Sequence, residues 1–415
     1  MKILMAKFGR GTGIVSGADV VPLQYFDALP KYNGHDPLHL VTGLNFYSEA
    51  PEAKRGDGLP RYVTISKNGH GESYAQSDDP AEIVSLAVSQ SPDIFHTHTR
   101  AGILGDIARK IKKRGGTVVH TMHGMDELKC RYAHEMFDNA DLILTPSEYS
   151  ADAIRALEHG KYAGKTWAFP NFTTMSDWRN DPEVKSRAKG IRDQYSQNGE
   201  KLILTTGRMN PDKGIYELAE AVAIMARNGE NVKLLHAGMI FSGDAMQQFE
   251  EIFTRYGVQG NYALLGQIDP MADPKELPAI YQASHVFILP SDTTNETFGL
   301  APLEALSQGT PIVVSNVGGT KEVYVDSKLA IGVAPRNVKS IINAAKEVLG
   351  NEERERHRAS IGAEVVKTIY HPDFLIPRLQ AAYERIHERP VVPDMPTIGG
   401  QMPSAITELD KHLNR

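Results

Sequence analysis

The feature that most constrains the fold of this chain is an alternation of short apolar runs with amphipathic segments of helix length. The runs are rich in Val, Ile and Leu, and they occur in both halves of the sequence. This pattern is typical of a parallel sheet with helical crossovers, and it predicts an α/β fold with two Rossmann-like, doubly wound domains. The strands predicted in the first half are 3–6, 38–42, 94–98, 118–122, 142–145 and 166–169. Those predicted in the second half are 202–206, 232–237, 263–266, 286–289, 312–315 and 331–334.

The length of 415 residues exceeds the usual size of one hydrophobic core, which also favours two domains. A polar stretch at 171–200 has the composition of a linker with one short helix, so we place the boundary there. The expected N-terminal domain is 1–172, and the expected C-terminal domain is 173–372. A helix predicted over 373–388 can pack back on the first domain, and a Pro-rich tail, 389–415, follows it. If the two domains face each other, their strand ends share a cleft where ligands bind.

Composition excludes several classes of protein. A net charge of −6 argues against a nucleic-acid-binding footprint. The only cysteine, Cys130, excludes an intrachain disulfide, and no Cys/His cluster has zinc-ligand spacing. The start of the sequence, MKILMAKFG, does not resemble a signal peptide, and no apolar run approaches about 18 residues. We therefore expect a cytoplasmic protein.

Five basic residues crowd the end of a predicted helix, and two interpretations of them stay open. They can attract anionic lipid, which would place the protein peripherally at the inner membrane face. They can equally form a solvated helix end that the helix dipole favours. The residues are Arg109, Lys110, Lys112, Lys113 and Arg114.

Glycines follow the first predicted strand, at Gly9, Gly11, Gly13 and Gly17. A glycine-rich turn between a strand and a helix lets backbone amides approach a phosphate, although it can also be a simple tight turn. The spacing differs from that of a dinucleotide-binding turn, and no acidic residue ends the second strand. This turn is a candidate phosphate site rather than a nicotinamide site.

A second candidate is the segment TTGRMNPDKG after the strand 202–206. Arg208 and Lys213 are five positions apart, and the residues between them favour a turn. Such a loop can direct both cations at one anion, as a departing diphosphate requires. The alternative is a pair of solvated charges beside a helix cap.

The third candidate is ETFGLAPLEA, which follows the strand 286–289. It places Glu296 in a loop and Glu304 about one turn inside a helix. Phe298, Gly299 and Leu300 stand at the helix start, where amides can hold a phosphate while Glu304 accepts bonds from a vicinal diol such as ribose. The alternative is that Glu296 is a dipole partner of the helix and that Glu304 is solvated.

The stretch 290–322 resembles the donor-binding signature of the retaining GT-B glycosyltransferases of family 4, also called glycosyl transferases group 1. The resemblance rests on the two glutamates, the Phe-Gly between them, and later Gly-Thr-Pro and Gly-Gly-x-x-Glu sequences. The family also has Gly-Arg after a strand and then lysine before glycine. The residues here are Gly207, Arg208, Lys213 and Gly214. Its N-terminal glycine loop is similar to Ser16-Gly17, where serine replaces the first of two glycines.

By this resemblance Glu304 binds the donor ribose, Arg208 and Lys213 bind the diphosphate, and Glu296 contacts the sugar. The resemblance also assigns donor contacts to Ser16, Gly17, Phe298, Gly299 and Leu300. It places His123, in VVHTMHG, beside the sugar.

Three other histidines, His96, His98 and His120, lie nearby in the sequence. Strand alternation puts His96 and His98 on one face, so at least one of these histidines can be a satisfied core residue.

The resemblance implies a metal-independent hexosyltransferase without a cofactor, for which UDP is the first choice of nucleotide and GDP the second. No carboxylate couple suits double displacement, and the family implies retention in which a donor phosphate oxygen takes the acceptor proton. The acceptor hydroxyl is open among a sugar, a small molecule and a lipid-linked compound. The alternatives are a catalytically silent sugar-nucleotide-binding or scaffold protein, a GT-B sugar-nucleotide epimerase and a phosphorylase.

Overall fold

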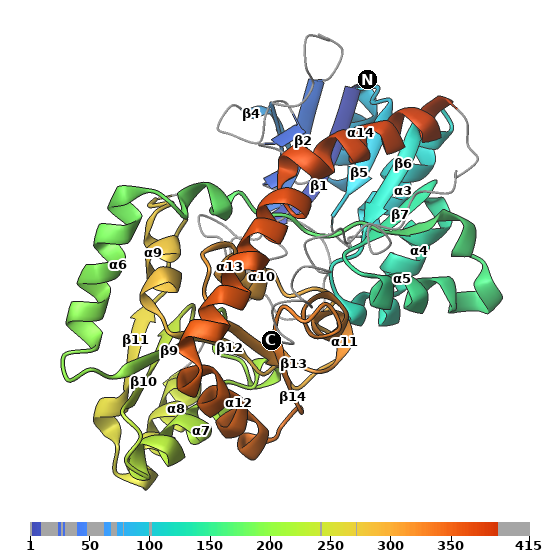
Figure 1. The fold of residues 1–415 in the computed structure, drawn as a ribbon. Helices are drawn as coiled ribbons and strands as arrows, with labels where there is room; N and C mark the ends of the chain where they lie inside the picture. The colour runs from blue at the N-terminus through green and yellow to red at the C-terminus, as the bar shows by residue number, and fades with distance from the viewer. Residues whose placement is uncertain are drawn as a thin grey trace. The chain divides into compact units, whose positions relative to one another are not determined.

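The structure is a computed structural model that describes residues 2–9, 24–25, 28–29, 40–47, 62–67, 73–77, 79–98, 102–240, 243–270 and 272–388. Within these residues the chain forms two compact units (Figure 1). The first unit contains the described residues up to Phe172 and the helix that starts at Pro372, and the second contains Thr173–His371. The chain thus returns to the first unit after completing the second.

The first unit is built on an eight-stranded sheet with the order β4-β3-β2-β1-β5-β6-β7-β8. Its strands are β1 Lys2–Gly9, β2 Leu40–Tyr47, β3 Tyr62–Lys67, β4 Ser73–Ser77, β5 Ile94–Thr97, β6 Thr117–Thr121, β7 Leu142–Thr145 and β8 Thr166–Ala168. Six of them are parallel, and β3 and β4 extend one edge in antiparallel register. The sequence pattern did not predict β3 and β4, because YVTISK and SYAQS are too polar to form an apolar run.

Helices of the first unit pack against this sheet. They are α2 Pro80–Ser89, α3 Gly102–Lys112, α4 Arg131–Asn139, α5 Glu148–Arg155 and α14 Pro372–Glu388, with short 3-10 helices η1 Met125–Lys129, η2 Leu157–Gly160 and η3 Ala163–Lys165. A buried core includes Ile83 of α2, Ile107 of α3 and Phe137 of α4 together with Leu4 and Val118 of the sheet. The apolar runs of the sequence thus form strands whose side chains are buried against the apolar faces of these helices.

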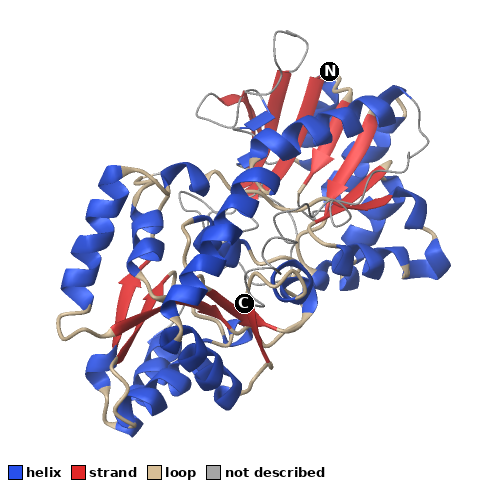
Figure 2. Ribbon diagram, in the orientation of Figure 1, coloured by secondary structure: helices blue, strands red, loops and turns tan. Residues whose placement is uncertain are grey.

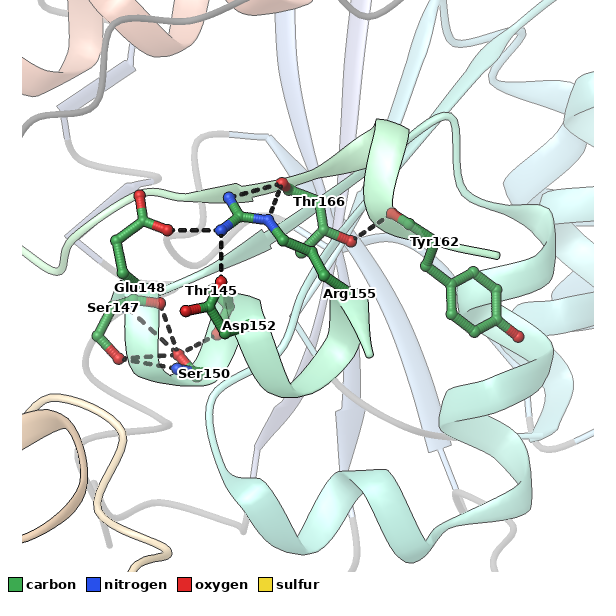
Figure 3. A network of polar contacts seen from close by, with 8 residues as sticks. All are labelled: Thr145, Ser147, Glu148, Ser150, Asp152, Arg155, Tyr162 and Thr166. Atoms are coloured by element: carbon green, nitrogen blue, oxygen red, sulfur yellow. Dashed lines mark hydrogen bonds and ion pairs between the residues drawn. The ribbon is translucent and has the colours of Figure 1, made fainter. Parts of the chain in front are cut away.

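A polar network fastens α5 to the edge strand β8 (Figure 3). Ser147 caps α5, since its Oγ accepts a hydrogen bond from the Ser150 amide. The Arg155 guanidinium pairs with Glu148 at 2.6 Å and donates from Nη2 to the carbonyl oxygen of Thr166 at 3.1 Å. The carboxyl end of β7 therefore leads into α5, and hydrogen bonds hold α5 in place at both of its ends.

The second unit contains a six-stranded parallel sheet with the order β11-β10-β9-β12-β13-β14. Its strands are β9 Lys201–Thr206, β10 Val232–Ala237, β11 Tyr262–Gly266, β12 Val286–Leu289, β13 Ile312–Ser315 and β14 Ile331–Val333. The strand order reverses between β9 and β12. In doubly wound sheets ligands bind at the carboxyl ends of the strands at this reversal.

Helices lie on both sides of this second sheet (Figure 2). One group consists of α7 Ile215–Arg227, α8 Gly243–Tyr256 and α12 Val338–Gly350. The other consists of α6 Pro182–Tyr195, α9 Glu276–Ala283, α10 Leu300–Ser307 and α13 Glu352–Ile369. Short elements are η4 Met175–Trp178, η5 Pro211–Lys213, η6 Gln259–Asn261, α11 Gly318–Thr320 and the π-helix η7 Lys321–Val325.

From Thr173 on, the stretch 171–200 belongs to the second unit and is not a linker, while the helix expected within it is present. It contains α6, a helix of 14 residues that packs on α9. Val184 and Ala188 of α6 are buried against Ala279 and Ala283 of α9. These few apolar residues recur at helical spacing, but the charged residues around them hide the pattern. Among the described helices, none is long and apolar enough to span a membrane.

Candidate functional site

The loop that carries Arg208 and Lys213 is fastened to the loop after β12. Gly214 has φ +66°, and a Cβ atom there would lie 2.1 Å from the carbonyl oxygen of Pro290. The Asp292 amide donates to the Asp212 carbonyl oxygen at 3.1 Å. The two loops follow β9 and β12, the strands at which the order of the sheet reverses. The fold therefore brings two candidate segments together.

Lys213 and Glu296 meet between these loops. The Lys213 Nζ lies 2.5 Å from the Glu296 Oε2, and the two side chains are 27% and 16% exposed. Arg208 is half-buried in the same loop as Lys213. The ammonium and the carboxylate are thus accessible but largely enclosed, which strengthens their electrostatic interaction with a ligand.

A glycine pair supports the backbone next to Glu296. The Gly319 amide donates to the Glu296 carbonyl oxygen at 2.9 Å, and a Cβ atom on Gly319 would lie 1.8 Å from the Thr297 carbonyl oxygen. Only glycine permits this close approach. The Gly-Gly part of the sequence signature therefore holds the Glu296 loop and need not contact a ligand.

The start of α10 follows a buried aromatic residue, Phe298, and a buried N-cap, Gly299. The Phe298 ring packs near Tyr324 and Tyr370, with ring centroids 6.1 and 5.9 Å away, so this side chain belongs to the core. Gly299 is the N-cap of α10, and its carbonyl oxygen accepts from the Tyr324 hydroxyl at 2.6 Å. Leu300 is half-buried. The amides of Leu300 and Ala301 in this first turn could bind an anion, and the core fixes the position of this helix end.

Glu304 lies on α10 and is half-buried, so the alternative of a simply solvated glutamate was wrong. The Tyr281 hydroxyl donates to its Oε2 at 3.1 Å, and the Thr206 hydroxyl lies 3.0 Å from that of Tyr281. Burial raises the pKa of Glu304 to about 7, and the hydrogen bond from Tyr281 opposes the shift. Sequence analysis missed Tyr281, because a tyrosine on a helix before a strand carries no distinguishing pattern.

Two histidines of the first unit form a pair at the carboxyl ends of neighbouring strands. His98 follows β5 and His123 follows β6. The His98 Nδ1 lies 3.1 Å from the His123 Nε2, and the planes of the two stacked rings make an angle of 20°. Burial lowers the pKa of His123 to about 4, a shift that Glu127 opposes. His123 is therefore neutral at pH 7 and can act as a hydrogen-bonding group.

His96 is a satisfied core residue, as the sequence analysis allowed, whereas the Nε2 of the equally buried His120 has no hydrogen-bond partner among the described residues. The His96 ring lies between the Tyr383 hydroxyl at 2.6 Å and the Thr121 hydroxyl at 2.7 Å. The His120 Nδ1 lies 2.6 Å from the hydroxyl of Thr97. Both rings are fully buried.

The sequence analysis missed a buried carboxylate behind the histidine pair. Glu127 accepts a hydrogen bond from the His123 amide at 2.9 Å, and its Oε2 lies 3.7 Å from the His120 Nε2. Burial favours a raised pKa, but the adjacent histidines and the amide outweigh it and leave the pKa of Glu127 lowered. Glu127 thereby fixes the backbone that carries His123.

Ser16 and Gly17 lie outside the described residues. In the part of the chain that the structure describes, no group of three or more His, Cys, Asp or Glu residues could hold a metal ion. Within the basic cluster, Arg109 contacts Asp106 and Glu135, Lys112 contacts Asp141, and Arg114 donates to the Val88 carbonyl oxygen. Two of the five cations, Arg109 and Lys112, are thus paired with carboxylates of the first unit.

Two family models match this sequence. The model of the glycosyl transferases group 1 matches residues 187–365, and the model of glycosyltransferase family 4 matches residues 15–172. Together they include both halves of the chain and the loops described above. The chain belongs to the family 4-like glycosyltransferases.

Among the relatives of this glycosyltransferase is an uncharacterized glycosyltransferase of Methanocaldococcus jannaschii, which is 36% identical over 156 residues. That match covers 37% of this chain and 37% of the relative. The alpha-monoglucosyldiacylglycerol synthase of Streptococcus pneumoniae is 28% identical over 253 residues, which cover 56% of this chain and 54% of that enzyme. The aligned parts thus span about a third and about half of these relatives.

A solved structure resembles most of this chain in fold. Anabaena HepE in complex with UDP-glucose matches with a TM-score of 0.71 and 17% identity over 92% of this chain and 99% of HepE. Together with the two parallel sheets, this likeness identifies the fold as GT-B, with two Rossmann-like domains.

Proposed function

We propose that this chain transfers a hexose from a nucleotide diphosphate-sugar to an acceptor hydroxyl with retention of configuration at the anomeric carbon. The observation that carries the proposal is the meeting of Lys213 and Glu296 beside the start of α10, at the reversal of a doubly wound sheet. UDP is our first choice of nucleotide, and the complex of HepE with UDP-glucose supports it.

Each residue has a role in this proposal. Glu304 binds the ribose hydroxyls, while Lys213, Arg208 and the first amides of α10 bind the diphosphate. Glu296 contacts the donor sugar. A neutral His123 in the first unit donates or accepts a hydrogen bond at the sugar.

The reaction proceeds on one face of the sugar. The bond between the anomeric carbon and the phosphate oxygen breaks, and its electron pair goes to the departing diphosphate. The acceptor oxygen bonds to the same face, and its proton passes to a phosphate oxygen. Lys213 and Arg208 stabilise the leaving group, and each well-placed donor contributes about 3 to 4 kcal/mol by analogy with oxyanion holes. We propose no metal ion and no enzyme nucleophile.

A thermal-shift screen of UDP-, GDP- and ADP-sugars tests the donor. A ligand at about 100 times its dissociation constant stabilises the native state by about 2.7 kcal/mol. We expect a UDP-sugar to give the largest rise in Tm. If no nucleotide sugar raises the Tm, the donor proposal is wrong.

Product analysis tests the chemistry. The donor that binds is incubated with a panel of sugar, small-molecule and lipid-linked hydroxyl acceptors, and proton NMR of the new linkage gives its configuration. Retention is expected, and inversion would refute the mechanism. Binding of the donor without transfer or hydrolysis would instead favour a silent binding protein, and epimerised donor would favour an epimerase.

A further inference from the structure

We infer that Tyr281 is a positioning residue of the donor site, which sets the orientation and ionisation of Glu304 and links it to the loop of Arg208. This inference rests on the proposed role of Glu304 toward the donor nucleotide. It assigns to Tyr281 a function beyond packing.

The Tyr281 hydroxyl joins two segments of the candidate site. It donates to the Glu304 Oε2 at 3.1 Å and lies 3.0 Å from the Thr206 hydroxyl. Thr206 is the last residue of β9, and Gly207 and Arg208 follow it directly. One buried hydroxyl thus connects the start of the proposed diphosphate loop with the proposed ribose-binding carboxylate.

The position of this hydroxyl is fixed by its surroundings. Tyr281 is fully buried on α9, and its ring meets that of Phe287 edge to face with centroids 5.8 Å apart. Its carbonyl oxygen accepts from the Thr310 hydroxyl at 2.8 Å. Because both the ring and the backbone are held, the hydroxyl can direct the carboxylate instead of following it.

A phenylalanine would fill the same space without the cost of burying a hydroxyl. The hydroxyl therefore has to be explained by what it bonds. A carboxylate has about four lone-pair positions, and Tyr281 occupies one of them on Oε2. The others remain for a vicinal diol, so the bond from Tyr281 selects which side of Glu304 meets the ribose.

The same bond acts on the charge of Glu304. A hydrogen bond to the ionised form stabilises it, and this opposes the effect of burial on the pKa of Glu304. Tyr324 of η7 also lies within electrostatic range of Glu304, and its hydroxyl donates to the Gly299 carbonyl oxygen. Without the Tyr281 hydroxyl, Glu304 should take up a proton at higher pH and lose its ability to accept two hydrogen bonds from a diol.

The test is calorimetric titration of UDP, with GDP in parallel, into the full chain between pH 6 and pH 9. For Tyr281→Phe we expect the midpoint of the affinity curve to rise by about one pH unit, which is about a 10-fold loss of affinity below the wild-type midpoint. Most of the affinity should return at pH 9, where Glu304 is ionised in both proteins. Thr206→Val should move the midpoint in the same direction by a smaller amount.

The matched control is Tyr256→Phe, which removes another hydroxyl that donates to a glutamate of this unit, Glu220, at 2.9 Å. It should leave the midpoint unchanged. An unchanged midpoint in Tyr281→Phe, with normal or uniformly reduced affinity, would overturn the inference and leave the donor proposal intact. If the wild-type chain binds neither UDP nor GDP and no nucleotide sugar raises its Tm, the donor proposal itself fails. Should Tyr281→Phe not fold, Thr206→Val decides the question.

Discussion

The ammonium group of Lys213 lies 2.5 Å from the carboxylate of Glu296, although the two residues are 83 positions apart in the sequence. Each belongs to a loop that follows one of the two strands at the reversal of the second sheet. A diphosphate that binds there would engage the same ammonium group. Lys213 therefore has two anionic partners in our proposal, one in the protein and one in the donor.

We predict that Lys213→Ala lowers kcat by about 10²- to 10³-fold, because it removes a cation that stabilises the departing diphosphate. Steady-state kinetics with the identified donor measures the effect. The control is Lys346→Ala, which removes an exposed ion pair with Glu230 and should leave kcat unchanged. Wild-type kcat in a folded Lys213→Ala variant would contradict the assignment.

Removal of the proposed ribose acceptor should act on binding. Glu304→Ala is expected to weaken UDP binding by about 10- to 100-fold at pH 8, since a hydrogen bond to a charged group contributes about 1.5 to 3 kcal/mol. Calorimetry measures the affinity, and circular dichroism checks the fold. Glu353→Ala changes an exposed glutamate of the same unit and should bind UDP normally.

Glu304 should also make the stability of the fold depend on pH. Its folded-state pKa of about 7 lies above the ordinary value of 4.5. Between pH 4.5 and pH 7 the folded chain therefore keeps a proton on Glu304 that the unfolded chain has lost. Ionisation thus lowers the free energy of unfolding as pH rises from 4.5 to 7, and the loss persists above 7. We expect Glu304→Gln to be more stable than wild type by about 1 to 3 kcal/mol at pH 8.

The same comparison at low pH is the control for this effect. Near pH 4 both forms of residue 304 are neutral in the folded chain, so the two proteins should unfold with similar free energies. Denaturant titrations at pH 4.5, 6 and 8 measure the difference. A stability gain that is equal at all three values would show that the charge of Glu304 is not its cause.

Two glycine-to-alanine substitutions should have opposite effects. Gly319→Ala forces a Cβ atom against the Thr297 carbonyl oxygen, and we expect a cost of about 1 to 3 kcal/mol and displacement of the Glu296 loop. Gly190 lies in α6 with nothing within 4 Å of its Cβ position, so Gly190→Ala should stabilise the chain by about 0.5 to 1 kcal/mol. Thermal unfolding compares them, and an equal Tm would contradict the packing argument.

The parallel strands and the loops that follow them were predictable, because both depend on local pattern. Apolar runs located the strands around Ile203 and Phe287, and glycine, proline and charge marked the segments after them. The strands β3 and β4 were not predictable, since β3 forms by pairing with β2 and β4 by pairing with β3, and not through their own hydrophobicity.

Contacts between residues far apart in the sequence were also not predictable. Tyr281 is 23 positions from Glu304 and 75 from Thr206, and no spacing rule relates them. Glu127 was hidden for a different reason, because a glutamate near a turn is usually solvated. Its role depends on burial beneath His123, which is a property of the packed unit.

The return of α14 to the first unit determines the order in which the protein can mature during its synthesis. Tyr383 is 287 positions from His96, its hydrogen-bond partner in the first unit. While the ribosome is still translating the intervening sequence, the His96 Nδ1 lacks this partner, and the face of the sheet that α14 covers has no covering helix. The described residues of the second unit all lie between Thr173 and His371, and no segment of the first unit comes between them. The unit that is made second can therefore be completed first, and the unit that is made first has to wait for the last helix.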